Sequence, residues 1–347
     1  MSQHQPIGIA LIGAGMIAER HVKAISAAQD DMHLRAVVSR NPDRARGLAE
    51  AYDGPAPIFT SDLSEIARDP DIHMAIVATP PSVRADVIAP LANAGKHILL
   101  EKPVGRTTAE ATEVVEICEE AGVTLGVLFQ HRVRDTARAA AKYVADGTLG
   151  RLGHVEIAVP IWRAQSYYDE LGRGTYARDG GGVLLTNAIH SIDLALSLTG
   201  PVKSVQAMTA TSPLHRMEAE DVAVVGLQFA SGAVGSLLAS TATFPHGTET
   251  IMLHFSQASL RMTKDTLTVS WHDGRVETPF KDNSDGVVVP LSGGQVAWHQ
   301  DVIADFATAI RTGSAPLVTG RQALESHALI TAIETSSRLG QRVDMGA

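Results

Sequence analysis

The fold is decided by the first hydrophobic stretch of the chain, Ile7–Ala18, which reads IGIALIGAGMIA. Residues 7–12 form a short apolar run that predicts a buried strand, and the pattern over 18–25 predicts a helix. The turn between them has the G-x-G-x-x-A spacing of the dinucleotide-binding fingerprint, in which glycines allow a tight turn and a close approach of a pyrophosphate to the helix N-terminus. We therefore expect a nucleotide to contact Gly13, Gly15, Met16 and Ile17.

Strands and helices then alternate along the chain as far as about residue 128. Apolar runs at 34–38, 72–78, 97–100 and 123–128 predict strands, and helical patterns separate them. This alternation is typical of a doubly wound parallel sheet. The sequence after it has β-strand patterns, several of which alternate polar and apolar residues, at 153–162, 202–210, 221–229, 233–239, 250–254 and 267–271. We predict an α/β + α+β chain, with a Rossmann domain at 1–128 and a substrate-binding and oligomerisation domain at 129–347 built on an open-faced, mainly antiparallel sheet.

Ligands bind at the carboxyl ends of the strands in such a sheet, so the residues that follow each strand are candidates for a cofactor site. The strand at 34–38 ends in Ser39-Arg40, where an NAD-selective protein usually has an acid, and Arg44 follows one turn later. A hydroxyl and guanidinium groups suit a 2′-phosphate. We predict that NADP(H) is preferred and that NAD(H) is possible. The alternative is that Arg40 is an ordinary solvated loop residue.

Two further strand ends carry candidate cofactor residues. One is Thr79-Pro80, and the other is Glu101-Lys102-Pro103, where a buried-looking run stops abruptly. Proline ends a strand and restricts the turn that follows, so Lys102 is expected at the mouth of a site. Without the neighbouring motifs, a solvated lysine would be the simpler interpretation.

A second polar motif follows the glycines at 180–182. The residues from 184 onward have helical spacing, and Thr186, His190 and Asp193 fall on one face because they are four and three residues apart. A structural histidine would be the simpler interpretation of His190 in isolation. No spacing typical of metal ligands surrounds it, so no metal site is predicted.

Taken together, these motifs resemble the Gfo/Idh/MocA (glucose-fructose oxidoreductase / inositol dehydrogenase-like) family. The resemblance rests on the fingerprint at 13–18, Glu101-Lys102-Pro103, and the segments 167–175 and 180–193. It implies a Rossmann domain, an open-faced sheet, and hydride transfer between a nicotinamide and a hydroxyl or carbonyl carbon of a sugar, inositol or related polyol.

The resemblance also implies catalytic roles for Lys102 and His190. His190 would move the hydroxyl proton, and Lys102 would stabilise charge on the reacting oxygen. Many members have an aspartate where this chain has Thr186, which cannot act as a base; we expect Thr186 to donate a hydrogen bond to substrate and Asp193 to be the candidate acid near His190. Further candidate substrate contacts, each with an equally good structural interpretation, are Arg132, Trp162, Arg163 and Tyr168.

Composition narrows the possible functions. The 347 residues carry a net charge of −9 with no basic cluster, which argues against nucleic acid as a partner. A lone cysteine, Cys118, excludes a disulfide framework, and no apolar run approaches the roughly 20 residues of a membrane span. We expect a cytoplasmic homodimer or homotetramer. Two alternatives remain, a nicotinamide-dependent glycoside-cleaving enzyme and a non-catalytic nucleotide-sensing regulator.

Overall fold

The computed structural model describes residues 6–28, 30–281 and 293–346, and the chain divides into two compact units. The first contains Met1–Gly105, Ala109–Gln130 and Val288–Leu324, and the second contains Arg106–Thr108, His131–Val287 and Glu325–Ala347. The expected division placed every residue after 128 in the second domain. It differs from the observed units because a late segment of the chain returns to the first.

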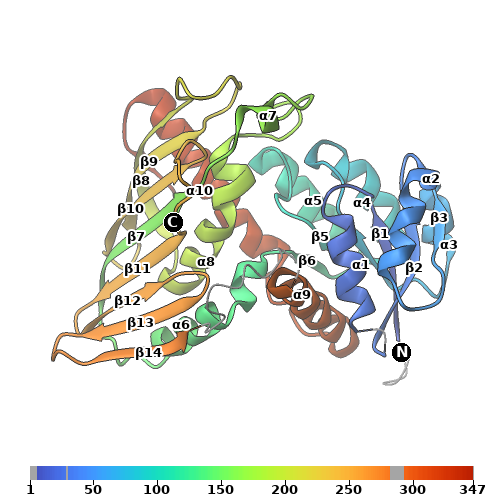
Figure 1. Cartoon of the computed structure of the whole chain (residues 1–347), viewed down its shortest axis with the longest axis horizontal. Helices are drawn as coiled ribbons and strands as arrows, with labels where there is room; N and C mark the ends of the chain where they lie inside the picture. The colour runs from blue at the N-terminus through green and yellow to red at the C-terminus, as the bar shows by residue number, and fades with distance from the viewer. Residues whose placement is uncertain (1–5, 29, 282–292, 347) are drawn as a thin grey trace. The chain divides into compact units, whose positions relative to one another are not determined.

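The first unit is built on a six-stranded parallel sheet with the order β3-β2-β1-β4-β5-β6 (Figure 1). Ile12 at the end of β1 pairs with Val38 of β2 on one side and Val77 of β4 on the other, and Val77 pairs with Leu100 of β5. The carboxyl ends of these strands therefore share one edge of the sheet. The strands are β1 (Ile7–Ile12), β2 (Met32–Val38), β3 (Ile58–Thr60), β4 (Met74–Val77), β5 (His97–Leu100) and β6 (Leu125–Val127).

Helices pack on this sheet, and the late helix α9 (Gly293–Thr312) packs against α1 (Ala18–Ser26). The apolar side of α1, with Ala18, Val22 and Ile25 fully buried, faces the core. The other helical segments of this region are α2 (Pro42–Ala45), η1 (Arg46–Ala51), α3 (Leu63–Arg68), η2 (Pro81–Val83), α4 (Arg84–Asn93) and α5 (Thr108–Glu120).

The second unit is built on a nine-stranded sheet with the order β14-β13-β12-β11-β7-β10-β9-β8-β15. It is mixed rather than purely antiparallel, because β7 and β10 run parallel. The sequence patterns missed β12 and β14. The strands are β7 (Leu152–Pro160), β8 (Val202–Ala210), β9 (Val222–Phe229), β10 (Val234–Ser240), β11 (Thr250–Phe255), β12 (Ala258–Met262), β13 (Thr266–Trp271), β14 (Val276–Lys281) and β15 (Val343–Asp344).

One face of the nine-stranded sheet is covered by helices and the other is open (Figure 1). Along β7, Val155 and Ile157 are buried whereas His154 and Glu156 are exposed, as the two-residue period of a strand requires. The helical segments that belong wholly or mainly to this unit are η3 (Gln130–Val133), α6 (Asp135–Ala145), α7 (Gln165–Tyr168), η4 (Leu184–Ala188), α8 (Ile189–Thr199) and α10 (Gly320–Leu339). The predicted combination of a parallel Rossmann sheet and an open-faced, mainly antiparallel sheet is confirmed. Within the described residues, no helix combines the length and apolarity that crossing a bilayer requires.

A substitution at Phe306 tests whether α9 packs in the core of the first unit. Its ring is 1% exposed and fills the space beside Gly126, so that a Cβ added to Gly126 would lie 2.6 Å from it. We expect Phe306→Ala to lower the free energy of unfolding by roughly 3–5 kcal/mol, because it removes apolar contacts and leaves a cavity. Thr308→Ala, on the exposed side of α9, should change it by less than about 0.5 kcal/mol. Urea unfolding of both variants measures this, and equal effects would contradict the packing described.

Candidate functional site

The glycine turn after β1 leaves room for a ligand beside Gly15, whereas Gly13 packs closely against the neighbouring backbone. Gly13 has a φ of +107°, and a Cβ there would lie 2.9 Å from the carbonyl oxygen of Ala78. At Gly15, by contrast, an added Cβ would meet nothing within 4 Å. Met16 is 81% exposed, and Ile17 caps α1 without a side-chain hydrogen bond to the helix. The turn therefore fits a pyrophosphate, which can approach Gly15 and the N–H groups at the start of α1.

At the end of β2, the basic residues point into solvent. Arg40 and Arg44 are exposed, and no ion pair or side-chain hydrogen bond engages their guanidinium groups within the described ranges. The Ser39 hydroxyl accepts a hydrogen bond from the N–H of Asn41 at 3.2 Å, and Asn41 in turn caps α2 by accepting from the N–H of Arg44. This turn is thus fixed by local hydrogen bonds, with two cations available to a phosphate.

A buried arginine, Arg84, fixes the turn after β4. Nε and Nη2 of Arg84 donate to the carbonyl oxygen of Thr79 at 3.3 and 3.1 Å. Burial lowers the pKa of Arg84 to about 9, with the charge of Glu101 opposing the shift. Arg84 therefore sets the course of the Thr79-Pro80 backbone.

The end of β5 holds a buried carboxylate between two histidines. Glu101 accepts a hydrogen bond from Nε2 of His21 at 2.9 Å, and Nε2 of His299 lies 3.8 Å from the same oxygen. Burial alone would raise the pKa of Glu101, but the hydrogen bond and charge of His21 and the charges of His299 and Lys102 outweigh it and lower the pKa to about 2. Through these histidines, Glu101 connects the end of β5 to helices α1 and α9. Its contact with a cofactor stays a prediction.

In the second unit, a buried acid holds the glycine loop that precedes His190. The Glu220 carboxylate accepts hydrogen bonds from the N–H groups of Gly182 and Leu184, both at 3.0 Å. A Cβ on Gly182 would lie 1.7 Å from the carbonyl oxygen of Glu220, so only glycine allows this approach. Glu220 was not predicted from the sequence, because nothing in its neighbourhood indicates a partner 36 residues away.

The helix then begins with a π-helical turn, η4. The Thr186 hydroxyl donates to the carbonyl oxygen of Gly182 at 2.6 Å, one turn earlier. The same hydroxyl lies 3.0 Å from a second acceptor, Oδ1 of Asn187. Two acceptors of the protein thus surround the Thr186 proton, whereas the sequence led us to expect a hydrogen bond to substrate.

His190 and Asp193 both contact the η3 turn. The His190 ring stacks on that of His131, with centroids 4.5 Å apart and planes 22° apart. Asp193 accepts from Nη2 and Nε of Arg132 at 2.7 and 2.8 Å. Burial raises the pKa of Asp193 to about 6, although Arg132 opposes the shift. Two predicted substrate contacts, Arg132 and Asp193, are thus bound to each other, and His131 is a neighbour that the sequence patterns missed.

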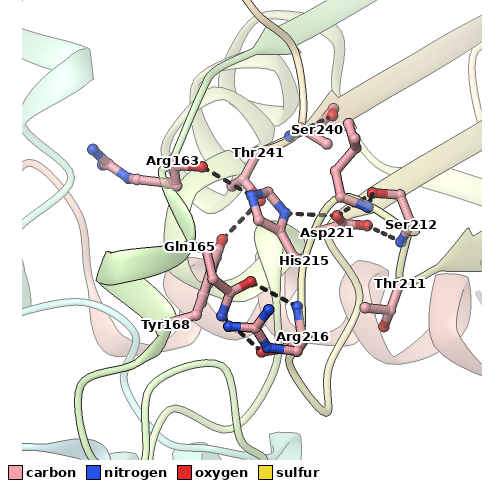
Figure 2. Close-up of polar contacts among 12 residues, drawn as sticks. Arg163, Gln165, Tyr168, Thr211, Ser212, His215, Arg216, Asp221, Ser240 and Thr241 are labelled. Atoms are coloured by element: carbon pink, nitrogen blue, oxygen red, sulfur yellow. Dashed lines mark hydrogen bonds and ion pairs between the residues drawn. The ribbon is translucent and has the colours of Figure 1, made fainter.

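Two of the predicted contacts, Arg163 and Tyr168, lie beside the buried His215 (Figure 2). His215 donates from Nε2 to the carbonyl oxygen of Arg163 at 2.8 Å, while Nδ1 lies 2.8 Å from Asp221. Asp221 also accepts from the N–H and hydroxyl of Ser212, both at 2.6 Å. His215 and Asp221 therefore hold the segment in place through its backbone, and neither was predicted.

Aromatic side chains gather around His215. The rings of Trp162 and Tyr168 lie 5.7 and 4.9 Å from it, and Trp162 also packs edge-on against Phe244, which is 74% exposed. The Tyr168 hydroxyl donates to Thr241 at 2.7 Å. Trp162 and Phe244 form a part-exposed aromatic pair of the kind on which a sugar face stacks, whereas Tyr168 is committed to an internal hydrogen bond.

A parallel sheet in the order 3-2-1-4-5-6, with a glycine turn at its switch point, defines the class of this chain as a dinucleotide-binding protein with a second, sheet-based unit. The model of a family described as "Oxidoreductase family, NAD-binding Rossmann fold" matches residues 7–129. The model described as "GFO/IDH/MocA C-terminal domain" matches residues 137–261. The chain belongs to the Gfo/Idh/MocA family of oxidoreductases, as its motifs led us to expect.

Relatives of this chain include dehydrogenases and reductases of sugars and polyols. Levoglucosan dehydrogenase of Pseudarthrobacter phenanthrenivorans is 28% identical over 266 residues, 68% of either chain. The structure of the WlbA dehydrogenase from Bordetella pertussis, in complex with NADH and UDP-GlcNAcA, superimposes with a TM-score of 0.82 at 30% identity, covering 99% of this chain and 100% of the other. A levoglucosan dehydrogenase in complex with NADH and levoglucosan gives 0.87 at 25% identity and the same coverage.

The buried Glu101 gives a prediction for stability against pH. Its folded pKa lies below the ordinary value, so its ionised form stabilises the fold above pH 4.5, and this contribution is lost as the pH falls toward 2. We expect Glu101→Gln to lower the free energy of unfolding by about 3 kcal/mol at neutral pH. The difference from the native protein should shrink as the pH falls below about 4.5 in urea unfolding measurements.

Glu119→Gln is the matched control, because Glu119 pairs with Arg321 at an exposed position. Its effect should stay below about 1 kcal/mol at every pH. A pH-independent loss in Glu101→Gln would contradict the role assigned to the buried carboxylate.

Proposed function

We propose that this protein is an NADP(H)-dependent oxidoreductase that transfers hydride between the nicotinamide and a hydroxyl or carbonyl carbon of a sugar, inositol or related polyol. Family membership supports the reaction type, and the named relatives support the substrate class. One observation supports the proposal most: the glycine turn follows β1 and Lys102 follows β5, and these strands end at the same edge of the parallel sheet.

The residues at this edge fit a nucleotide with a 2′-phosphate. The turn at 13–17 offers N–H groups to the pyrophosphate, and Thr79-Pro80 continues the same edge. Ser39, Arg40 and Arg44 supply a hydroxyl and two exposed cations where an acid would be needed to select NAD(H). The NADP(H) preference rests on these residues alone, since the structures compared above contain NADH.

We assign separate roles to the two catalytic residues. When bound, the nicotinamide accepts or supplies the hydride. His190 takes the proton from the substrate hydroxyl in oxidation and returns it in reduction, a role suited to imidazole near neutral pH. The Lys102 ammonium donates a hydrogen bond to the reacting oxygen and stabilises its negative charge as it develops. Asp193, paired with Arg132, positions the helix of His190 without exchanging the proton.

The remaining predicted contacts divide by their geometry. Trp162 and the guanidinium of Arg163 are candidates for stacking on and hydrogen bonding to the sugar, because the segment that carries them is anchored by His215. Thr186 and the ring of Tyr168 would contact the substrate. Arg132 and Asp193 would support the site through their mutual ion pair.

We propose further that the chain forms a homodimer or homotetramer through the open face of its nine-stranded sheet. Strand pairing places Met208 beside Val224 and Val224 beside Leu238, and these side chains are 62%, 46% and 46% exposed. Apolar side chains in a continuous exposed row favour association. The lone Cys118 supports a cytoplasmic setting. Burial raises the pKa of its thiol to about 12, so the thiol is inert.

Replacing either catalytic residue should abolish turnover while leaving nucleotide binding intact. We expect Lys102→Ala and His190→Ala each to reduce kcat by at least about 100-fold with sugars and polyols, because each removes charge stabilisation or proton transfer. Stopped-flow absorbance at the reduced-nicotinamide band measures turnover, and fluorescence titration measures NADPH affinity. Native-like kcat in either variant would remove that residue from the mechanism.

The same assay distinguishes the oxidoreductase from the two alternatives, a nicotinamide-dependent glycoside-cleaving enzyme and a non-catalytic nucleotide-sensing regulator. A sugar product formed with no net change in NADPH would indicate glycoside cleavage. Tight NADPH binding without any product would indicate a sensor.

Cofactor preference depends on Arg40. Arg40→Ala should lower kcat/KM for NADP by at least about tenfold and leave kcat/KM for NAD nearly unchanged, since only the former carries a 2′-phosphate. Arg68→Ala, an exposed arginine on α3, serves as the control and should alter neither value. A native preference for NAD would overturn the assignment.

A further inference from the structure

A second cluster of histidines and an acid lies on the open face of the nine-stranded sheet. His154 of β7 pairs directly with His254 of β11, and Glu156 follows His154 by two residues, so all three point to one face. Their side chains are 46%, 30% and 47% exposed in the order His154, His254 and Glu156. In a single chain, these side chains are accessible to a small ligand from solvent.

The ligand-bearing atoms of this cluster converge. Oε1 of Glu156 lies 3.2 Å from Nε2 of His254 and 3.7 Å from Nδ1 of His154, and all three atoms lie within 4.8 Å of one another. A tetrahedral ion with bonds of about 2.0–2.1 Å keeps neighbouring ligands roughly 3.3 Å apart. The two distances from Glu156 lie close to that spacing, on either side of it, and the two imidazole rings stack with centroids 5.3 Å apart.

A neighbouring hydroxyl can hold His254 in the tautomer that binds a metal through Nε2. Nδ1 of His254 lies 2.8 Å from the Ser259 hydroxyl, on the paired strand β12. When Nδ1 donates to this oxygen, the lone pair is on Nε2, which faces Glu156. Metal-binding histidines are usually oriented by such a hydrogen bond from the other ring nitrogen.

We propose that His154, Glu156 and His254 form a binding site for a divalent transition-metal ion of the zinc type. Two imidazoles and one carboxylate suit Zn²⁺ and its neighbours, whereas Mg²⁺ and Ca²⁺ prefer oxygen ligands alone. The exposed position leaves a fourth coordination place to water. The site goes beyond the proposed oxidoreductase function and does not depend on it. The sequence did not predict it, because its ligands come from two strands about 100 residues apart.

The buried trio of His21, Glu101 and His299 is a poorer cation site, although its ligand atoms are equally close. Its side chains are 0%, 11% and 1% exposed, and the positive charges of Arg84 and Lys102 act on Glu101. A divalent cation would have to displace the His21 hydrogen bond against these charges. The open-face cluster has neither obstacle.

An ion at the open-face site would join β7 to β11 and bind only the folded chain. Binding restricted to the folded state raises thermal stability with ion concentration. Metal-stripped, full-length protein should therefore bind one Zn²⁺ per chain in calorimetric titration with ZnCl₂, and its Tm should rise. Co²⁺ should give the visible absorption of a tetrahedral site, and MgCl₂ should have no effect.

Histidine substitutions test whether the ion binds at His154, Glu156 and His254. His154→Asn and His254→Asn should each weaken Zn²⁺ binding at least tenfold, with native far-UV circular dichroism showing that they fold. His272→Asn, an exposed histidine in the turn after β13, should bind as the native chain does. Absence of Zn²⁺ binding by the native chain would overturn the proposal. So would binding that survives both substitutions but is lost in His299→Asn, which would assign the ion to the buried trio. Turnover with sugars is measured separately, so either result leaves the proposed function untouched.

Discussion

The first unit depends on one buried carboxylate. Glu101 follows β5 directly, and burying its charge is tolerable only because His21 donates to it and His299 lies close by. Those histidines come from α1, the helix of the glycine turn, and from α9, nearly 200 residues later. One interaction therefore links the nucleotide turn, the Lys102 turn and the returning helix.

The second unit repeats this principle with three other acids. Glu220 binds the backbone of the glycine loop, Asp193 pairs with Arg132, and Asp221 holds His215 and Ser212. Each buried acid requires donors, because an unpaired charge in the interior is costly. Asp193 and Glu220 take theirs from distant segments, whereas Asp221 takes them from residues within nine positions. The loops around His190 and Trp162 are thereby fixed without any of these acids needing to touch a substrate.

Much of the fold was readable from local patterns. The apolar run at 7–12 and the glycine spacing predicted the Rossmann sheet, and alternation predicted β8 closely. Other strands were missed for a physical reason: β12 carries Ser259 and Arg261 on its open face and is only five residues long, so its apolar signal is weak. The return of α9 has no local signal either, since its amphipathic pattern does not say which sheet it covers. Among candidate site residues, Lys102 and His190 were found by motif, whereas His131, Glu220 and His215 were found only by contact.

The sequence by itself determined the class of the chain, the strand-end turns, the basic Ser39-Arg40 pair and the helical spacing of Thr186, His190 and Asp193. These features depend on neighbours within a few residues, where backbone geometry fixes the outcome. Only the tertiary structure decided that Glu101 faces two histidines, that Arg132 neutralises Asp193, and that His154 and His254 lie side by side. Such partners are selected by burial and charge compensation between segments far apart in the chain, which local spacing does not encode.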